Sequence, residues 1–130
     1  MSSILRFASF LFAFSLLGTS SLYAQGFFPY DEKAFSAASA AGHGVVLDFH
    51  AEWCPTCRKQ ERVLTEILAA APYSSLTIFK VDYDSAKELK SEYKIRRQST
   101  LVLLKSGKEL NRSIALTSKQ DLADFLKPAL

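Results

Sequence analysis

The feature that most constrains this chain is an apolar run that leads within a few residues to a pair of cysteines. Residues 45–50 are Val-Val-Leu-Asp-Phe-His, an almost continuous apolar stretch that Asp48 interrupts. Such a run is typical of a central strand buried on both faces. From Cys54 onward the apolar residues recur at helical spacing, and Pro72 ends that pattern. The sequence therefore predicts a buried strand followed directly by a helix, with Cys54 and Cys57 in the first turn of the helix.

The rest of the chain alternates helix and strand patterns. Helices are expected at residues 31–41, 85–93 and after 117, the first capped by Asp31 and the others opened by capping-box patterns that start at Ser85 and Thr117. Strands are expected at residues 76–83, 100–104 and 110–115, with Ser106-Gly107 as the turn between the last two. This order predicts an α/β fold with a mixed central sheet and helices on both faces.

Composition and charge exclude several classes of protein. The 130 residues carry a net charge of +3, too mild for the strongly basic face expected of a nucleic-acid-binding protein. Two cysteines are too few for a disulfide-dense secreted scaffold. With two histidines, at positions 43 and 50, the chain offers four possible zinc ligands, but their spacing is poor. We therefore expect one globular domain, no nucleic-acid partner and no metal site.

The N-terminus has the features of a secretory signal peptide, residues 1–24. Arg6 is its only charged residue, and the apolar run of residues 7–17 follows. Ala24 offers a cleavage site, which leaves a mature domain of residues 25–130. The alternative is a retained anchor, although a membrane-spanning helix needs about 20 apolar residues. The expected location is the periplasm or another exported, oxidising compartment.

The position of the two cysteines indicates their chemistry. Unpaired N–H groups and the dipole at a helix N-terminus stabilise a thiolate, which favours Cys54 as the exposed nucleophile. Pro55 fits the first helical position, where its missing N–H costs nothing. Cys57 lies one turn further along the helix, where it can close a disulfide with Cys54 as the shielded, resolving thiol.

Four segments of the chain resemble the thioredoxin family: residues 46–57, 79–82, 93–96 and 100–107. The resemblance covers the chain from Asp31 to the C-terminus and implies a thioredoxin fold with thiol–disulfide exchange. It also implies that Asp48, beneath the cysteines, relays a proton to or from Cys57, and that Lys80 lies on the adjoining strand near Asp48. No cofactor beyond the redox-active cysteines is implied.

The residues themselves support part of this assignment. A carboxylate inside an apolar strand is costly, and burial raises its pKa, which suits Asp48 as a general base; a structural acid is the alternative. Lys80 is either a tuning partner or an exposed strand lysine. Trp53 is expected to shield the disulfide and contact substrate, unless it is a core residue. For His50, packing is favoured over a metal or base role.

Two departures from the family pattern bear on function. The dipeptide between the cysteines is Pro55-Thr56 instead of the Gly-Pro of typical thioredoxins, which leaves the redox potential open between roughly −270 and −120 mV. The family's cis-proline is replaced by Ser99, where a cis bond would cost about 3 kcal/mol. Either the Gln98–Ser99 bond is trans and the loop is remodelled, or the loop holds strain. Ser99 therefore bears on substrate recognition. It adds a hydroxyl beside the sulfurs and a backbone N–H that is a candidate donor to the Cys54 thiolate.

The leading hypothesis is an exported, monomeric thiol:disulfide oxidoreductase that acts on protein thiols and disulfides, principally as a reductase. A reductase in an oxidising compartment needs electrons from outside, so a membrane electron donor is the implied partner. A disulfide oxidase or isomerase is the alternative enzyme. A thioredoxin-like binding module with little or no redox turnover is the alternative of a different class.

Overall fold

The computed structural model describes residues 26–130. The predicted signal peptide, residues 1–24, and its cleavage after Ala24 lie outside the described residues. Within residues 26–130, no helix combines the length and the apolar character that crossing a membrane requires.

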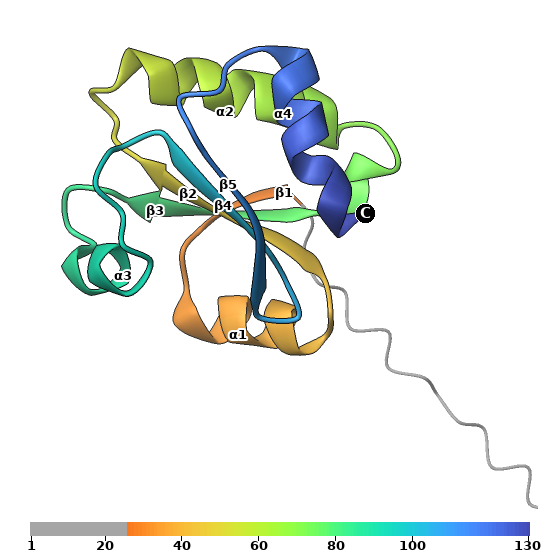
Figure 1. Cartoon of the computed structure of the whole chain (residues 1–130), viewed down its shortest axis with the longest axis horizontal. Coiled ribbons are helices and arrows are strands. Elements are labelled where there is room, and N and C mark those ends of the chain that lie inside the picture. The colour runs from red at the N-terminus through yellow and green to blue at the C-terminus, as the bar shows by residue number, and fades with distance from the viewer. Residues whose placement is uncertain (1–25) are drawn as a thin grey trace, which may run out of the picture.

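A five-stranded mixed sheet forms the centre of the molecule (Figure 1). Its strands are β1 (Gly26–Pro29), β2 (Gly44–His50), β3 (Thr77–Asp82), β4 (Thr100–Lys105) and β5 (Lys108–Ile114). They lie in the order β1-β3-β2-β4-β5, with β3 parallel to both β1 and β2, and with β4 antiparallel to β2 and β5. The predicted mixed sheet is confirmed, and β2 is the central strand that the apolar run predicted.

Helices cover both faces of this sheet (Figure 1). On one face lie α1 (Glu32–Ala40) and α3 (Lys87–Glu92), and on the other α2 (Pro55–Leu68) and α4 (Lys119–Leu126). Two short 3-10 turns complete the described chain, η1 (Tyr73–Ser75) and η2 (Lys127–Ala129). Each face of the sheet has its own apolar cluster, and together these clusters form the core.

Side-chain alternation along β2 decides what lies beneath α2. Val45, Leu47 and Phe49 belong to the apolar cluster on the α1 side, whereas Val46 belongs to the cluster on the α2 side. Since successive strand residues point to opposite faces, Asp48 and His50 share the α2 side with Val46. A carboxyl group and an imidazole therefore enter the layer between the sheet and α2.

The structure corrects the predictions at three places. Strand β1 was not predicted, because four residues at the sheet edge are too few to show an alternating pattern. The capping box at Ser85 is wrong: α3 starts after Ala86 without a side-chain cap, and the Ser85 hydroxyl donates to Asp82 at 2.5 Å. The last helix is capped by Ser118, one residue after the predicted Thr117.

The predicted turn between the last two strands is confirmed. Ser106 and Gly107 are the two residues between β4 and β5 and have φ values of 52° and 72°. Two successive positive φ values are typical of a tight type I′ hairpin, whose twist matches that of the flanking strands.

Candidate active site

The cysteine pair lies where β2 gives way to α2. The Cys54 N–H donates to the Ala51 carbonyl at 3.0 Å, which makes the turn after the strand. Cys54 is the N-cap residue of α2, and Pro55 occupies the first helical position, as predicted. The Cys57 N–H, which has no partner within the helix, donates to Cys54 Sγ at 3.2 Å. The local sequence thus places a sulfur where the helix has unpaired N–H groups.

Both cysteines are free thiols, and their sulfurs lie 2.6 Å apart. Cys54 is 2% exposed and Cys57 is 0% exposed, so the prediction that Cys54 is the exposed member of the pair is wrong. Both cysteines form a buried cluster with Ala51, and the partly buried Tyr83 packs against this cluster. The distinction between the two thiols therefore depends on their hydrogen bonds and not on their exposure.

Electrostatics separates the two thiols in the predicted direction. Burial raises the pKa of Cys54, but hydrogen bonds from Cys57, Ser99 and the backbone outweigh it and hold that pKa below its ordinary value. Burial raises the pKa of Cys57, and its contact with Cys54 raises it further. Of the two thiols, Cys54 therefore ionises first as the pH rises, and Cys57 keeps its proton to higher pH.

Ser99 approaches both sulfurs through its hydroxyl group. Its Oγ lies 3.3 Å from Cys54 Sγ and 2.9 Å from Cys57 Sγ. Its backbone is held by the sheet: the N–H donates to the Phe49 carbonyl, and the Ser99 carbonyl accepts from Ala115, both at 2.9 Å. The prediction of the backbone N–H as donor to the thiolate is therefore wrong, whereas the hydroxyl lies beside the sulfurs as expected.

The loop at Ser99 is remodelled and not cis. Within residues 26–130 the Ala71–Pro72 peptide is the one cis bond, so Gln98–Ser99 is trans. Ser99 instead has a φ of 60°, in the left-handed region that few non-glycine residues occupy. Of the two predicted alternatives, the structure has the trans bond, with the conformational strain at the φ of Ser99.

The remaining predicted residues beside the cysteines form a rim around them. Trp53 is 58% exposed, so the core alternative for this tryptophan is wrong. Its indole N–H donates to Asp84 at 2.9 Å, which fixes the ring outside the sulfur pair. Pro55 is exposed and Thr56 is half-buried. This rim thus includes an exposed aromatic ring and an exposed proline, each next to Cys54 in the sequence.

Asp48 is completely buried, and neither of its carboxyl oxygens has a hydrogen-bond partner. Burial raises the pKa of this carboxyl, as the sequence predicted. Lys80 stands directly opposite Asp48 in the β2–β3 register, which confirms its expected place on the adjoining strand. However, the Lys80 ammonium makes its short contact with Glu61, at 2.8 Å.

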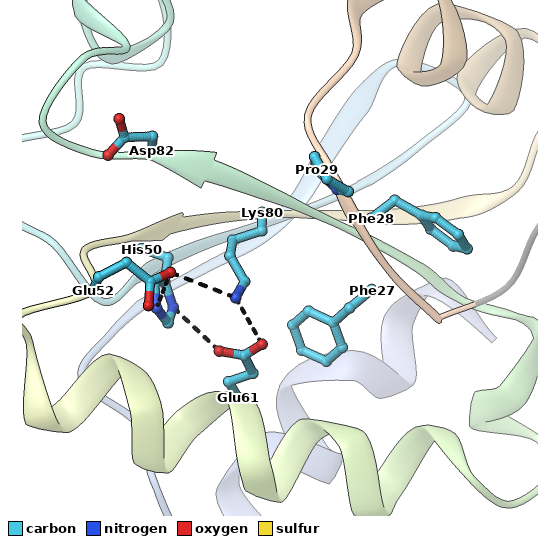
Figure 2. A pocket seen from close by; sticks show the side chains of 8 residues that line it. All are labelled: Phe27, Phe28, Pro29, His50, Glu52, Glu61, Lys80 and Asp82. Carbon is cyan, nitrogen blue, oxygen red and sulfur yellow. Dashed lines mark ion pairs between the residues drawn. The ribbon is translucent and has the colours of Figure 1, made fainter.

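A third side chain, His50, lies beside Asp48 on the same strand. Its Nδ1 is 3.7 Å from Asp48 Oδ2 and 3.7 Å from Glu61 Oε2, and its Nε2 is 3.5 Å from Glu52 Oε1. The Asp48 carboxyl raises the pKa of this imidazole. His50 lines a cleft of about 400 Å³ with seven other residues: Phe27, Phe28, Pro29, Glu52, Glu61, Lys80 and Asp82 (Figure 2).

Sequence reasoning did not assign functional importance to His50, Glu52 or Glu61. Two signals were available. Asp48 and His50 are two residues apart in a predicted strand, which places them on one face. Glu61 follows Cys57 by four residues in a predicted helix, which places both on the side that packs against the sheet. No sequence pattern indicated Phe27, because β1 itself was not predicted.

In residues 26–130, no group of three or more His, Cys, Asp or Glu side chains is arranged to hold a metal ion. The redox-active group is part of the chain itself, the thiol pair of Cys54 and Cys57.

Comparisons with known proteins agree with this geometry. The family model described as Thioredoxin matches residues 27–128. The chain is 41% identical over 90 residues to a thioredoxin of Chlamydia trachomatis, covering 69% of this chain and 86% of that protein. It is 35% identical over 85 residues to a thioredoxin H-type of Fagopyrum esculentum, covering 65% of this chain and 71% of that protein. The crystal structure of Trxlp from Edwardsiella tarda is similar, with a TM-score of 0.74 and 42% identity, covering 78% and 98% of the two chains.

Proposed function

Because this chain belongs to the thioredoxin family, whose members are thiol:disulfide oxidoreductases, we propose that it is an exported reductase of protein disulfides. The observation that carries the proposal is the thiol pair at the start of α2, in which the pKa of Cys54 is lowered and that of Cys57 is raised. Export rests on the sequence of residues 1–24, which has the basic start, apolar run and cleavage site of a signal peptide.

The first step is attack by the Cys54 thiolate on one sulfur of a substrate disulfide. A bond forms between Cys54 Sγ and that sulfur, and the substrate's S–S bond breaks. The released substrate thiolate takes up a proton from solvent. The lowered pKa of Cys54 increases the fraction of thiolate available for this attack, because the hydroxyl of Ser99 and the N–H of Cys57 stabilise its charge.

In the second step Cys57 releases the substrate. Its thiol loses a proton, and the thiolate attacks Cys54 Sγ, forming the Cys54–Cys57 disulfide and expelling the second substrate thiolate. The raised pKa of Cys57 means that this step needs a base. Asp48 is the proposed base, since burial raises the pKa of its carboxyl toward the range in which it accepts a proton efficiently. The substrate gains two electrons and two protons, and the protein loses the same.

The physiological setting follows from this chemistry. Each turnover leaves the protein oxidised, and an oxidising compartment does not restore the dithiol. We therefore expect a membrane electron donor that reduces the Cys54–Cys57 disulfide, and a monomer whose exposed Trp53 rim meets the substrate and the donor in turn.

Reduction of insulin by dithiothreitol tests the proposal, with the protein lacking residues 1–24 as the catalyst. Wild type should accelerate precipitation of the insulin B chain, and Cys54→Ser should not. Lys119→Ser, at the exposed first residue of α4, serves as the matched control and should keep wild-type activity. A wild type with freely reacting thiols but no turnover would overturn the reductase and favour the binding module.

A disulfide oxidase is the second candidate, and the Ser99 hydroxyl favours it. A donor that stabilises the Cys54 thiolate stabilises the reduced protein, and a stabilised reduced form makes a stronger oxidant. Equilibration with glutathione separates the two. A potential near that of thioredoxin, about −270 mV, supports the reductase, and one nearer about −120 mV supports the oxidase.

A further inference from the structure

A connected set of charged side chains runs from the fully buried Asp48 to the protein surface. Asp48 is 0% exposed, His50 beside it is 2% exposed, and Glu52 on the far side of the imidazole is 83% exposed. Figure 2 shows the His50 ring between Glu52 and Glu61, with Lys80 reaching down to the same two carboxylates. The two nitrogens of one ring thus face a buried acid and a solvated carboxylate.

The burial of these groups is costly for a purely structural role. Neither oxygen of Asp48 and neither ring nitrogen of His50 has a hydrogen-bond partner. A buried polar group without a hydrogen bond costs roughly 1–3 kcal/mol, and an apolar side chain at position 50 would avoid that cost for the imidazole. The Nδ1 of His50 and the Oδ2 of Asp48 are 3.7 Å apart, so a small shift would form the hydrogen bond through which a proton passes.

We propose that His50 conducts protons between Asp48 and the cleft, so that Asp48 regains its working protonation state after each disulfide exchange. This inference rests on the proposed function, because it assigns a route to the proton that Cys57 gives up. His50 acts through Asp48, so it is a positioning residue for the reaction and not a catalytic one.

The protons balance in both directions. When Cys57 has given its proton to Asp48, the carboxyl passes a proton to Nδ1 of His50, and Nε2 releases one to Glu52 or to water in the cleft. When the disulfide is later reduced, a proton enters at Nε2, and Nδ1 returns one to Asp48 for the departing Cys57 thiolate. Disulfide formation thus moves the ring proton from Nε2 to Nδ1, and disulfide reduction moves it back to Nε2. The 3.7 and 3.5 Å contacts reach hydrogen-bond length with shifts of about 1 Å or less.

Charged groups from three elements face His50 and set its proton affinity. Asp48 belongs to the same strand, Glu61 comes from α2, and Lys80 comes from β3, while Glu52 follows the strand. Lys80 is paired to Glu61 at 2.8 Å, which offsets one negative charge near the ring. Asp82, opposite His50 in the register, is held by the Ser85 hydroxyl and the Asp84 N–H and lies apart from the cluster in Figure 2.

The cleft provides the outlet for this route. It has a volume of about 400 Å³, and the ring of Phe27 forms its wall beside Lys80 and Glu61 (Figure 2). A space of this size holds several water molecules, since each occupies about 30 Å³ in the liquid. It also admits a free imidazole molecule if the side chain of His50 is removed, which makes the proposal testable by chemical rescue.

The test is the rate at which the Cys54–Cys57 disulfide forms when reduced protein meets excess glutathione disulfide, followed between pH 5 and 9. His50→Ala and His50→Gln should slow the resolving step about tenfold at neutral pH and change its pH profile. Free imidazole should restore His50→Ala, whereas pyrazole, of the same shape but far less basic, should not. His43→Gln, at the chain's other histidine, is the matched control and should match wild type.

Two further measurements make the outcome decisive. Alkylation of Cys54 in His50→Ala should keep the wild-type rate, because the first step does not use the route; melting temperatures establish that both variants are folded. A wild-type resolving rate and pH profile in folded His50→Gln, or equal rescue by pyrazole, would overturn the proton route. A wild type that exchanges no disulfide at all would overturn the proposed function instead.

Discussion

Two buried polar groups lie close to the junction of β2 and α2, and the fold treats them in opposite ways. Cys54 Sγ accepts from the Cys57 N–H and contacts the Ser99 hydroxyl, so its charged form is stabilised. Asp48, in the strand before it, has no hydrogen bond at either oxygen, so its charged form is penalised. Hydrogen bonds thus favour the thiolate form of Cys54, whereas burial favours the protonated form of Asp48.

This difference matches two separate roles in disulfide exchange, that of the nucleophile at Cys54 and that of the base at Asp48. A nucleophile must be ionised before the substrate arrives, which explains the hydrogen bonds around Cys54. A base must change its protonation within each cycle, and a carboxylate locked in strong hydrogen bonds would be a poor base because its pKa would be low. The lack of hydrogen bonds to Asp48 destabilises its charged form, but it also keeps the pKa of the carboxyl high enough for the proposed role as a base.

The largest expected effect comes from replacing one of the two cysteines. Cys57→Ser should accumulate mixed disulfides with substrate through Cys54, because attack proceeds and resolution does not. Cys54→Ser should accumulate few. Non-reducing electrophoresis with mass spectrometry identifies the adducts. Equal trapping by the two variants would show that the cysteines are interchangeable and that the hydrogen-bond asymmetry is without consequence.

Replacing the acid should have the next largest effect. Asp48→Asn cannot accept a proton from Cys57 and should slow turnover about 10²-fold at neutral pH, in the range of a positioned acid–base group. The loss should be greatest where wild-type Asp48 is ionised and smallest at low pH, where the wild-type carboxyl is also protonated. A wild-type rate throughout pH 6 to 9 would leave Asp48 with a structural role alone.

Substitutions of Ser99 test what its hydroxyl contributes to the pKa of Cys54. Ser99→Ala removes a donor to Cys54 and should raise the pKa of that thiol, slowing alkylation at pH 7 a few-fold, whereas Ser99→Thr should retain most of the effect. An identical pH midpoint in Ser99→Ala and wild type would refute this role for the hydroxyl.

The proline of the family does not fit the loop as it stands here. Proline fixes φ near −65° and lacks the N–H that bonds Phe49, whereas Ser99 has a φ of 60°. Ser99→Pro should therefore destabilise the fold by more than about 1 kcal/mol. Thermal unfolding measures the effect, and an unchanged melting temperature would contradict the account of the loop.

The smallest expected effect is a stability difference that grows with pH. The raised pKa of Asp48 means that the unfolded chain ionises first as pH rises above about 4, which weakens the fold until the folded-state pKa is passed. Asp48→Asn has no such loss. It should therefore melt above wild type at pH 8, by about 4–8 °C per kcal/mol, and the difference should shrink toward pH 4. A constant difference across this range would contradict the raised pKa.

Sequence alone was sufficient for the parts of the molecule that depend on local pattern. The buried strand, the helix start at Cys54 and the pKa direction of Asp48 follow from residues within a short window, and the structure agrees. Family resemblance placed Lys80 opposite Asp48 correctly. These features depend on alternation, capping and burial, which act over a few residues.

The features that sequence did not provide depend on packing between distant segments. The contacts of His50 with Glu61 bring together a strand and a helix, and no motif joins these residues. The burial of Cys54 depends on Tyr83 and Ser99, from two other loops. The conformation of Ser99 is set by bonds to Phe49 and Ala115, so its φ was not predictable from its own neighbours.

Competitive alkylation of the reduced wild-type protein tests the central claim most directly. Iodoacetamide is applied between pH 5 and 10, and fragment-ion mass spectrometry measures modification at Cys54 and Cys57 separately. We expect Cys54 to react first, with a midpoint below the ordinary thiol value, and Cys57 to react only at higher pH. Faster labelling of Cys57 at neutral pH, or equal titration of both thiols at the ordinary value, would contradict it.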